Sequence, residues 1–238
     1  MISIVIPSYK NSDILRKQLP GFLFHLNSKG YEFEIIIVDD GSNDGGGAEK
    51  VAKEFNCRFY QNPINTGKGG AVKNGMLIAK GDVCLFTDAD IPFEYKNLDS
   101  FIEYIQVKGY DLAIGDRTLP ESTYFTEISK KRKIGSNIFT FIVGRFITTG
   151  VFDTQCGLKA FSGNVARDLF SKTRITSFAF DVELIYISLK RNYDIKKLPV
   201  QLRIQEGGSS VNLLKHSFGM VMDLFKMKIN HLKGYYNK

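Results

Sequence analysis

Short runs of apolar and β-branched residues alternate with longer mixed segments through the first half of the chain. Five of these runs predict strands: residues 2–7, 33–40, 57–61, 82–90 and 111–117. The stretches between them predict helices: residues around 13–29, 46–55, 68–80 and 94–107. This alternation is typical of βαβ units, so we predict an α/β fold in which helices cover both faces of a mostly parallel central sheet.

Acidic residues stand at the ends of three predicted strands, next to positions that should be buried. Asp39 and Asp40 close the second run, Asp88 and Asp90 close the fourth, and Asp116 lies near the end of the fifth. Charged groups at such positions cost free energy unless they are paired or bound to a cation. Because ligands of open α/β sheets bind beyond the carboxyl ends of the strands, we expect the two pairs to share one cleft. Carboxylates there could hold Mg²⁺ or Mn²⁺.

The glycine-rich stretches do not match the common nucleotide-binding loops. Neither residues 40–47 nor residues 65–75 fit GxxxxGK[ST], and neither places GxGxxG directly after a strand. A P-loop or a dinucleotide-binding fold is therefore disfavoured. Gly67 and Lys68 could still bring backbone and a cation to a diphosphate, although the same glycines could simply form the turn before a helix.

Two segments of the second half combine basic and apolar residues. Between residues 128 and 152 there is no acidic residue, and the basic ones are Lys130, Lys131, Arg132, Lys133 and Arg145. Near the C-terminus one apolar stripe recurs at helical spacing: Leu214, Phe218, Val221, Phe225, Ile229 and Leu232. Such segments are typical of helices that lie on a membrane surface, but a stripe of this kind can equally pack on the domain or on a second copy of the chain.

Composition and charge narrow the class of protein. With 238 residues, 43% of them apolar, the chain can bury a full core. Its three cysteines form no CxxC pair, and its first residues lack the features of a signal peptide, so we expect a cytoplasmic protein. The net charge of +7 favours an anionic partner. Nucleic acid is disfavoured, because the basic residues concentrate beside apolar segments and paired acids occupy the expected cleft.

Eight sequence blocks resemble one enzyme family. IVIPSYKN, IIIVDDGSND, NTGKGGAVKNG and LFTDADIP, in this order and spacing, resemble the nucleotide-sugar-binding half of inverting family 2 glycosyltransferases with the GT-A fold. GDR, DTQCGLKAF, FAFDVELIYI and EGGSS resemble the branch that glycosylates polyprenyl phosphates, the dolichyl-phosphate glucosyltransferase and mannosyltransferase type. The resemblance implies a catalytic domain at about 1–210, with a donor half at 1–115 and an acceptor half at 116–210. The basic amphipathic helix that we expect at 211–238 follows instead from its apolar stripe and its lysines.

The resemblance also implies roles for individual residues. The donor-binding residues would be Pro7, Tyr9, Asp39, Asp40, Gly67, Lys68 and Asp88. The metal ligands, for Mg²⁺ or Mn²⁺, would be Asp88 and Asp90. The acceptor-binding residues would be Arg117, Arg132, Lys133 and Gln155. The catalytic set would be completed by Asp153 and Asp181, which fall where the family shapes the sugar and acceptor pocket.

These features predict a metal-dependent, inverting transfer of a hexose from a nucleotide sugar to a polyprenyl phosphate on the cytoplasmic membrane surface. UDP-glucose is the first expectation for the donor, with UDP-linked amino sugars and GDP-mannose as alternatives. A lipid phosphate is already negatively charged at neutral pH and attacks without a strong base. A hydroxyl acceptor would need one, such as Asp153 or Asp181, because the matching blocks contain no histidine.

The same features also allow a different acceptor or a different enzyme class. A glycosyltransferase that acts on a sugar hydroxyl in cell-surface polysaccharide synthesis remains the alternative. A nucleotidylyltransferase would need a basic, glycine-rich loop directly after the first strand. The chain has PSYKNSD there, so that class is disfavoured.

Overall fold

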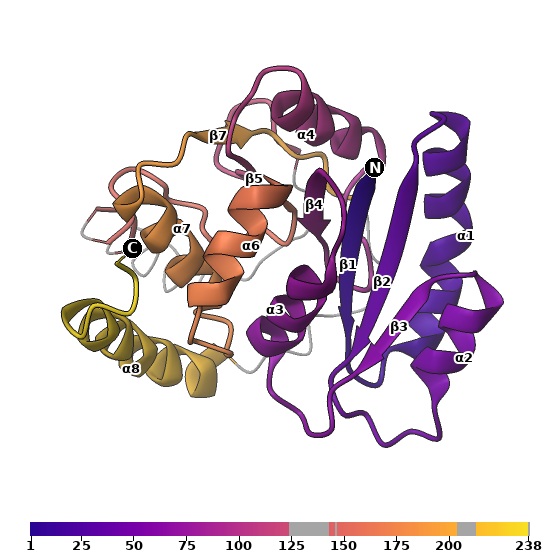
Figure 1. Ribbon diagram of the computed structural model, residues 1–238, viewed down its shortest axis with the longest axis horizontal. Helices are drawn as coiled ribbons and strands as arrows, with labels where there is room; N and C mark the ends of the chain where they lie inside the picture. Colours follow the sequence, from indigo (N-terminus) through magenta and orange to yellow (C-terminus); the bar gives the residue numbers. More distant parts are fainter. Residues whose placement is uncertain (124–142, 146, 204–212, 238) are drawn as a thin grey trace.

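The computed structural model describes residues 1–123, 143–145, 147–203 and 213–237. One seven-stranded sheet with the order β3-β2-β1-β4-β6-β5-β7 forms its centre (Figure 1). The strands are β1 (Ile2–Ser8), β2 (Phe33–Asp39), β3 (Arg58–Gln61), β4 (Val83–Phe86), β5 (Leu112–Gly115), β6 (Lys159–Ser162) and β7 (Ile195–Leu198). Only β6 runs antiparallel to its neighbours β4 and β5, so the predicted mostly parallel sheet is confirmed.

Helices cover both faces of this sheet, as predicted. One hydrophobic core contains buried residues of α1 (Ser12–Ser28), α2 (Gly47–Glu54) and α4 (Lys96–Gln106). The second core contains those of α3 (Lys68–Ile78), α6 (Gly163–Lys172) and α7 (Phe180–Lys190). All five predicted strands and all four predicted helices of the first half are present. Most of them bury a continuous apolar run or an apolar face, whereas β3 lies at the edge of the sheet and is largely exposed.

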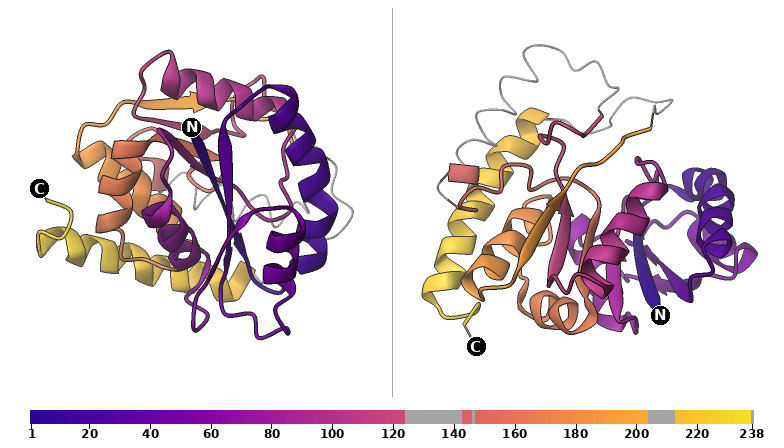
Figure 2. Two further views of the ribbon diagram at one scale, coloured as in Figure 1. Left: turned by 45° about the vertical axis from the view of Figure 1, so that its right-hand side comes forward. Right: turned by 90° about the horizontal axis from the view of Figure 1, so that it is seen from above.

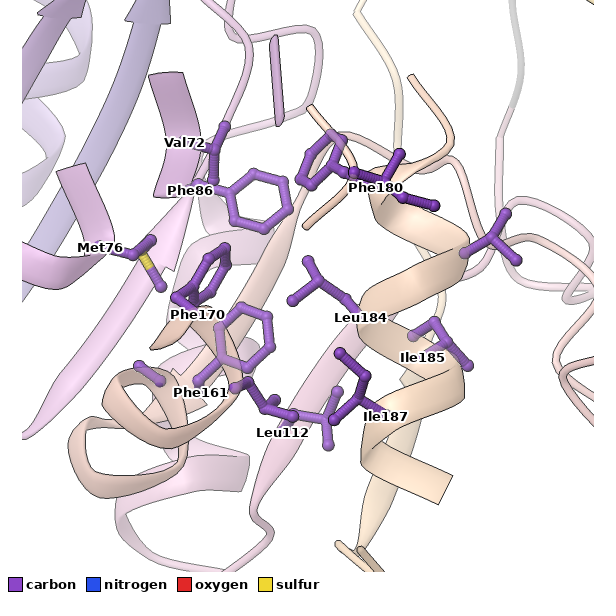
Figure 3. Packing of buried hydrophobic residues seen from close by; sticks show 14 of the residues in the cluster. Val72, Met76, Phe86, Leu112, Phe161, Phe170, Phe180, Leu184, Ile185 and Ile187 are labelled. Atoms are coloured by element: carbon purple, nitrogen blue, oxygen red, sulfur yellow. The ribbon is translucent and has the colours of Figure 1, made fainter. Parts of the chain in front are cut away.

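Aromatic packing fixes β4, the strand that leads into the Asp88 turn. The ring of Phe86 lies 6.2 Å from that of Phe161 on β6 and 5.7 Å from that of Phe180 on α7. Phe170 of α6 completes the group with an edge-on contact to Phe86 at 6.3 Å (Figure 3). Such aromatic pairs stabilise a fold by about 0.5–1.5 kcal/mol each beyond the area that they bury. This packing therefore holds the end of β4 firmly in place.

The last helix, α8 (Leu213–Leu232), lies along the outside of the layer formed by α6 and α7 (Figures 1 and 2). Met227 on its inner face is fully buried, and Met220 and Leu224 pack against the same core. The predicted apolar stripe faces away: Val221, Phe225, Ile229 and Leu232 are all exposed. The predicted helix is thus present, but in the described part its stripe does not pack on the domain.

The other predicted basic segment, residues 128–152, falls mainly outside the described residues. In its described part Val143 is fully buried and Ile147 packs against the same core, so these two side chains face the protein. Within the described ranges, no helix combines the length and the hydropathy needed to cross a bilayer.

Candidate functional site

The carboxyl ends of β1, β2 and β4 meet at one edge of the sheet. Ser8 of β1 pairs in parallel with Asp39 of β2, and Val5 of β1 pairs in parallel with Phe86 of β4. The three strands therefore point the same way and end side by side. This arrangement brings the two predicted acidic pairs to one edge, with β1 between them.

A tight turn presents Asp88 and Asp90. The Ile91 amide donates a hydrogen bond to the Asp88 carbonyl at 3.0 Å, and Ile91 has a φ of +40°. A β-branched residue in this region is strained, at a cost of about 1–3 kcal/mol, and burial of the Ile91 side chain helps to offset it. Gly157 packs directly against the turn, because a Cβ at this position would lie 2.2 Å from Asp88 Oδ2.

Lys68, the first residue of α3, reaches into the same turn. Its Nζ lies 2.6 Å from Asp88 Oδ1, and only 16% of its side chain is exposed. Burial opposes the charge, but the neighbouring carboxylates of Asp88 and then Asp181 raise the pKa of Lys68 above its ordinary value. Lys68 therefore remains a cation next to the predicted metal ligands.

The position of Lys68 follows from the glycine before it. Gly67 has a φ of +89°, and a Cβ there would lie 2.7 Å from the Thr176 carbonyl oxygen. Only glycine fits this close approach without strain. The Gly69 amide donates to the same carbonyl at 2.8 Å. The beginning of α3 is thus fixed against the segment that precedes α7.

Asp40 holds the loop that leads to Gly67. Its carboxylate accepts hydrogen bonds from Asn62 Nδ2 at 2.7 Å, from the Thr66 amide at 2.9 Å and from Thr66 Oγ1 at 2.7 Å. The Gly67 amide donates to its other oxygen at 2.8 Å. Asp40 is nearly completely buried, so these four donors replace water around its charge. Through this loop, Asp40 sets the position of Lys68.

Asp39 joins the ends of β1 and β2. It accepts hydrogen bonds from the Ser42 amide at 3.0 Å and from Ser42 Oγ, which in turn accepts one from the Lys10 amide at 2.9 Å. Next to Lys10, the ring of Tyr9 is 43% exposed. Pro7 is half-buried at the end of β1. The predicted donor-binding residues therefore line one edge of the sheet, and Tyr9 offers an open ring.

A buried ion pair lies behind the Asp88 turn. Lys159 Nζ is 2.5 Å from Asp181 Oδ1 and 2.7 Å from the Cys156 carbonyl oxygen. Burial raises the pKa of Asp181, against the opposing effects of Lys159 and then Lys68. Asp181 is thus the link between the two lysines. Lys159 is not among the site residues expected from the sequence, although a lysine inside the short apolar run LKAF is a usable signal.

Arg117 and Asp153 form a second pair. Arg117 Nε donates to Asp153 Oδ2 at 2.8 Å, a terminal guanidinium nitrogen donates to Oδ1 at 2.7 Å, and the Arg117 amide donates to Oδ2 at 2.7 Å. Burial works against the charge of Asp153, yet Arg117 lowers the pKa of this carboxyl below its ordinary value. The side chain of Arg117 is 35% exposed. Asp153 therefore holds the guanidinium in one orientation while part of the side chain reaches solvent.

The other predicted acceptor-binding residues are placed only in part. Gln155 Nε2 lies 3.8 Å from the sulfur of Met220, so the segment after Asp153 touches α8. Arg132 and Lys133 fall outside the described residues.

The donor set at the turn fits a hard divalent cation that keeps open coordination positions. Asp88 and Asp90 supply carboxylate oxygens, which Mg²⁺ and Mn²⁺ prefer. Among the described residues, no group of three or more His, Cys, Asp or Glu side chains is arranged to hold a metal. The remaining ligands would have to come from water and from substrate, as is common for metals that bind phosphates.

Sequence comparison assigns the chain to a class of enzymes. Residues 3–170 match the Glycosyl transferase family 2 model. The chain therefore belongs to glycosyl transferase family 2, and the predicted enzyme class, a glycosyltransferase, is confirmed.

Curated relatives share nearly the whole length of the chain. It is 33% identical to the dolichyl-phosphate beta-glucosyltransferase of Drosophila melanogaster, over 98% of this chain and 76% of the relative. It is 31% identical to the enzyme of the same name from Dictyostelium discoideum, over 98% of this chain and 75% of the relative. For the human enzyme of that name the identity is 29%, over 98% of this chain and 76% of the relative.

Solved structures share the fold. Mannosyl-3-phosphoglycerate synthase from Rubrobacter xylanophilus superposes with a TM-score of 0.73 at 18% identity, over 100% of this chain and 76% of that one. Glucosyl-3-phosphoglycerate synthase from Mycobacterium tuberculosis, in complex with UDP, gives a TM-score of 0.71 at 17% identity, over 95% and 79% of the two chains. The predicted GT-A fold is confirmed.

Proposed function

We propose that this protein transfers glucose from UDP-glucose to a polyprenyl phosphate, with inversion at the anomeric carbon, on the cytoplasmic surface of a membrane. The observation that carries the proposal is the match, along nearly the whole chain, to several relatives that are all named dolichyl-phosphate beta-glucosyltransferase. The UDP found in glucosyl-3-phosphoglycerate synthase supports a uridine nucleotide as the donor.

The donor would bind across the ends of β1, β2 and β4. Pro7, Tyr9 and Asp39 would line the nucleotide side, with Asp40 and Gly67 shaping the loop beside it. The diphosphate would lie against Lys68, whose ammonium contacts Asp88.

Asp88 and Asp90 would hold Mg²⁺ or Mn²⁺, which structures of glucosyl-3-phosphoglycerate synthase contain together with UDP. When bound, the cation would stabilise the negative charge on the departing UDP.

The state of the carboxylates favours a phosphate acceptor over a hydroxyl. A hydroxyl would need a general base, and the two predicted candidates are both engaged. Asp153 is bound by Arg117, which lowers its pKa, and Asp181 is bound by Lys159. A phosphate oxygen needs no such base and would be oriented by the guanidinium of Arg117. Asp153 and Asp181 then act as positioning residues for Arg117 and for the two lysines.

The acceptor half would extend beyond Arg117. Arg132, Lys133 and Gln155 would contact the same phosphate or the chain next to it. Residues 1–115 would thus form the donor half and residues 116–210 the acceptor half.

The exposed face of α8 would lie on the membrane. It carries five exposed apolar side chains: Val221, Met222, Phe225, Ile229 and Leu232. Lys226 and Lys233 lie beside them and would face anionic lipid headgroups, whereas the Lys228 ammonium lies 5.3 Å from the ring of Tyr186 on α7. The contact of Gln155 with Met220 links this helix to the acceptor half, so a lipid phosphate could reach Arg117 from the membrane. A second copy of the chain is the other occupant that this face could take.

A transfer assay with paired acceptors tests the proposal. The purified protein is incubated with Mg²⁺ or Mn²⁺, labelled UDP-glucose, GDP-mannose or UDP-N-acetylglucosamine, and either a polyprenyl phosphate or the matching polyprenol in detergent. Label that enters the organic phase only with UDP-glucose and the phosphate supports the proposal. Equal labelling of the polyprenol would overturn it in favour of a hydroxyl acceptor.

A further inference from the structure

We propose that Lys68 is a built-in counter-ion of Asp88, which gives up this contact when Asp88 binds a divalent cation and then pairs with the diphosphate of the donor. Metal and nucleotide would therefore bind cooperatively, and each alone would bind weakly. The inference rests on the proposed function for the identity of the donor, and it assigns a step of site assembly to one residue.

The contact between Lys68 and Asp88 already occupies a position that the cation would need. Lys68 Nζ lies 2.6 Å from Asp88 Oδ1, so one of the two oxygens is engaged by an ammonium. The other oxygen, Oδ2, faces the backbone of Gly157, where a Cβ would lie only 2.2 Å away. A divalent cation at Asp88 would thus stand next to the positive charge of the Lys68 ammonium. Like charges at such short separation repel strongly in a partly buried site, so Lys68 disfavours the cation for as long as it stays in place.

Asp88 is not the only carboxylate that acts on the Lys68 ammonium. Asp181 and, with a smaller effect, Asp90 also attract it. Asp181 is already bound by Lys159, so it could neutralise only part of the charge of Lys68. The negative charge of a bound diphosphate would neutralise the rest. The long, flexible side chain of lysine allows this exchange of partners, because its ammonium is a compact point charge on four methylene groups.

The main chain on both sides of Lys68 is held by hydrogen bonds. The Gly67 amide donates to Asp40 at 2.8 Å, and the Gly69 amide donates to the Thr176 carbonyl at 2.8 Å. The residues on both sides are therefore anchored before any ligand arrives. Only the side chain has to move, which keeps the exchange local and fast compared with a loop rearrangement.

A measurable coupling follows from this arrangement. Nucleotide that draws Lys68 away from Asp88 raises the affinity for the cation, and by thermodynamic reciprocity the cation raises the affinity for the nucleotide by the same factor. Removing the ammonium should raise the affinity of the free protein for the cation and reduce the coupling. Replacing it with another cation should preserve both.

The test measures Mn²⁺ binding directly, from the electron paramagnetic resonance signal of free Mn²⁺, without lipid and without turnover. Wild type, Lys68→Gln, Lys68→Arg and Lys80→Gln are titrated with and without UDP. Lys80 is an exposed lysine just beyond the opposite end of α3, so Lys80→Gln controls for the loss of one positive charge. Circular dichroism melts establish that each variant is folded.

We expect Lys68→Gln to bind Mn²⁺ about 10-fold more tightly than wild type without UDP, and to lose most of the enhancement that UDP gives. Lys68→Arg and Lys80→Gln should behave like wild type. Unchanged or weaker Mn²⁺ binding by Lys68→Gln without UDP overturns the inference and leaves the proposed function standing.

An added Asp88→Asn variant separates the role of Lys68 from the existence of the metal site. We expect this variant to lose Mn²⁺ binding, in support of a metal site at Asp88. If Asp88→Asn binds Mn²⁺ like wild type, the inference fails together with the metal site of the proposed function.

Discussion

The ammonium of Lys159 lies 2.5 Å from the carboxylate of Asp181, and the two side chains are 0% and 3% exposed. Asp181 interacts electrostatically with both Lys159 and Lys68, so this pair is coupled to the contact between Lys68 and Asp88. A buried pair of this kind is weak evidence for stability when compared with an apolar pair, but breaking it leaves an uncompensated charge in the core. The site therefore depends on the presence of both Lys159 and Asp181.

The first prediction concerns this buried pair. Lys159→Met should lower the free energy of unfolding by about 3–5 kcal/mol, because Asp181 would remain buried without its main partner. Adding Asp181→Leu should recover part of the loss. Urea denaturation followed by circular dichroism measures both variants.

An exposed pair provides the control. Lys53 and Glu49 form an i, i+4 contact of 2.7 Å on the surface of α2, and Lys53→Met should change the unfolding free energy by less than about 0.5 kcal/mol. Equal effects of Lys53→Met and Lys159→Met would contradict the assignment of Lys159 and Asp181 as a structural pair.

The second prediction concerns the metal ligands. Asp88→Asn and Asp90→Asn should each lower kcat by about 100-fold or more, since they remove charge that would hold the cation on the departing diphosphate. Both amides should keep the thermal stability of wild type within a few degrees. Asp82→Asn, at an exposed carboxylate before β4, is the matched control and should retain full activity. Full activity in either site variant would remove that residue from the metal site.

The third prediction separates acceptor from donor. Arg117→Ala should raise the KM for polyprenyl phosphate by about 10- to 100-fold, the range expected for a lost charge-assisted hydrogen bond, and should change the KM for UDP-glucose far less. Steady-state kinetics with one substrate varied at a time provide the measurement. Arg117→Lys should show an intermediate effect, because lysine cannot reproduce the two-pronged contact with Asp153. An equal rise in both KM values would exclude Arg117 from the acceptor site.

The fourth prediction is a pH dependence that arises from Asp153. Its pKa lies below the ordinary value of 3.8 in the folded protein, so the unfolded chain binds a proton more readily than the native one. The stabilisation from this carboxylate is therefore fully present above about pH 4 and is lost as the pH falls through the folded-state pKa. The difference in unfolding free energy between wild type and Asp153→Asn should shrink as the pH is lowered from 5 toward 3. A difference that stays constant over this range would contradict the pairing with Arg117.

The fifth prediction concerns the exposed face of α8. Phe225→Glu and Ile229→Glu should each weaken binding to vesicles that contain anionic lipid by about 10-fold or more, because each places a charge where an apolar side chain would enter the membrane. Co-sedimentation with vesicles measures this. Val107→Glu, at an exposed apolar residue after α4, should have no effect. If the α8 variants bind vesicles normally but dissociate a dimer in sedimentation velocity, the face contacts a second copy instead.

The two halves of the chain differ in how far the sequence predicts their elements. In the first half the strands and helices were predictable, because apolar or β-branched runs alternate with mixed helical segments, although β3 is largely exposed. β6 was not predicted, because Lys159 interrupts its short apolar run and because the partner of that lysine, Asp181, lies 22 residues away. The acidic pairs were correctly expected to share one edge of the sheet. The hydrogen bonds that Asp40 accepts from a loop 22–27 residues further on could not be predicted, because they depend on how that loop folds back.

The apolar stripe of α8 illustrates a different limit. Its spacing predicts a helix, but spacing alone does not decide which face meets the protein. Met220 and Met227 pack inward, while Phe225 and Ile229 point outward. Methionine fills irregular gaps well, so the inner face here is less hydrophobic by pattern than the outer one. A stripe that stays exposed on a packed helix is informative about a partner rather than about the core.

The measurement that tests the central claim most directly is an NMR analysis of the lipid product formed from UDP-glucose. The claim is that a phosphate oxygen attacks the anomeric carbon in one displacement. It predicts an anomeric proton with β configuration and a scalar coupling to phosphorus. An α-linked product, or an anomeric position without coupling to phosphorus, would contradict it, because the first requires retention and the second a hydroxyl acceptor.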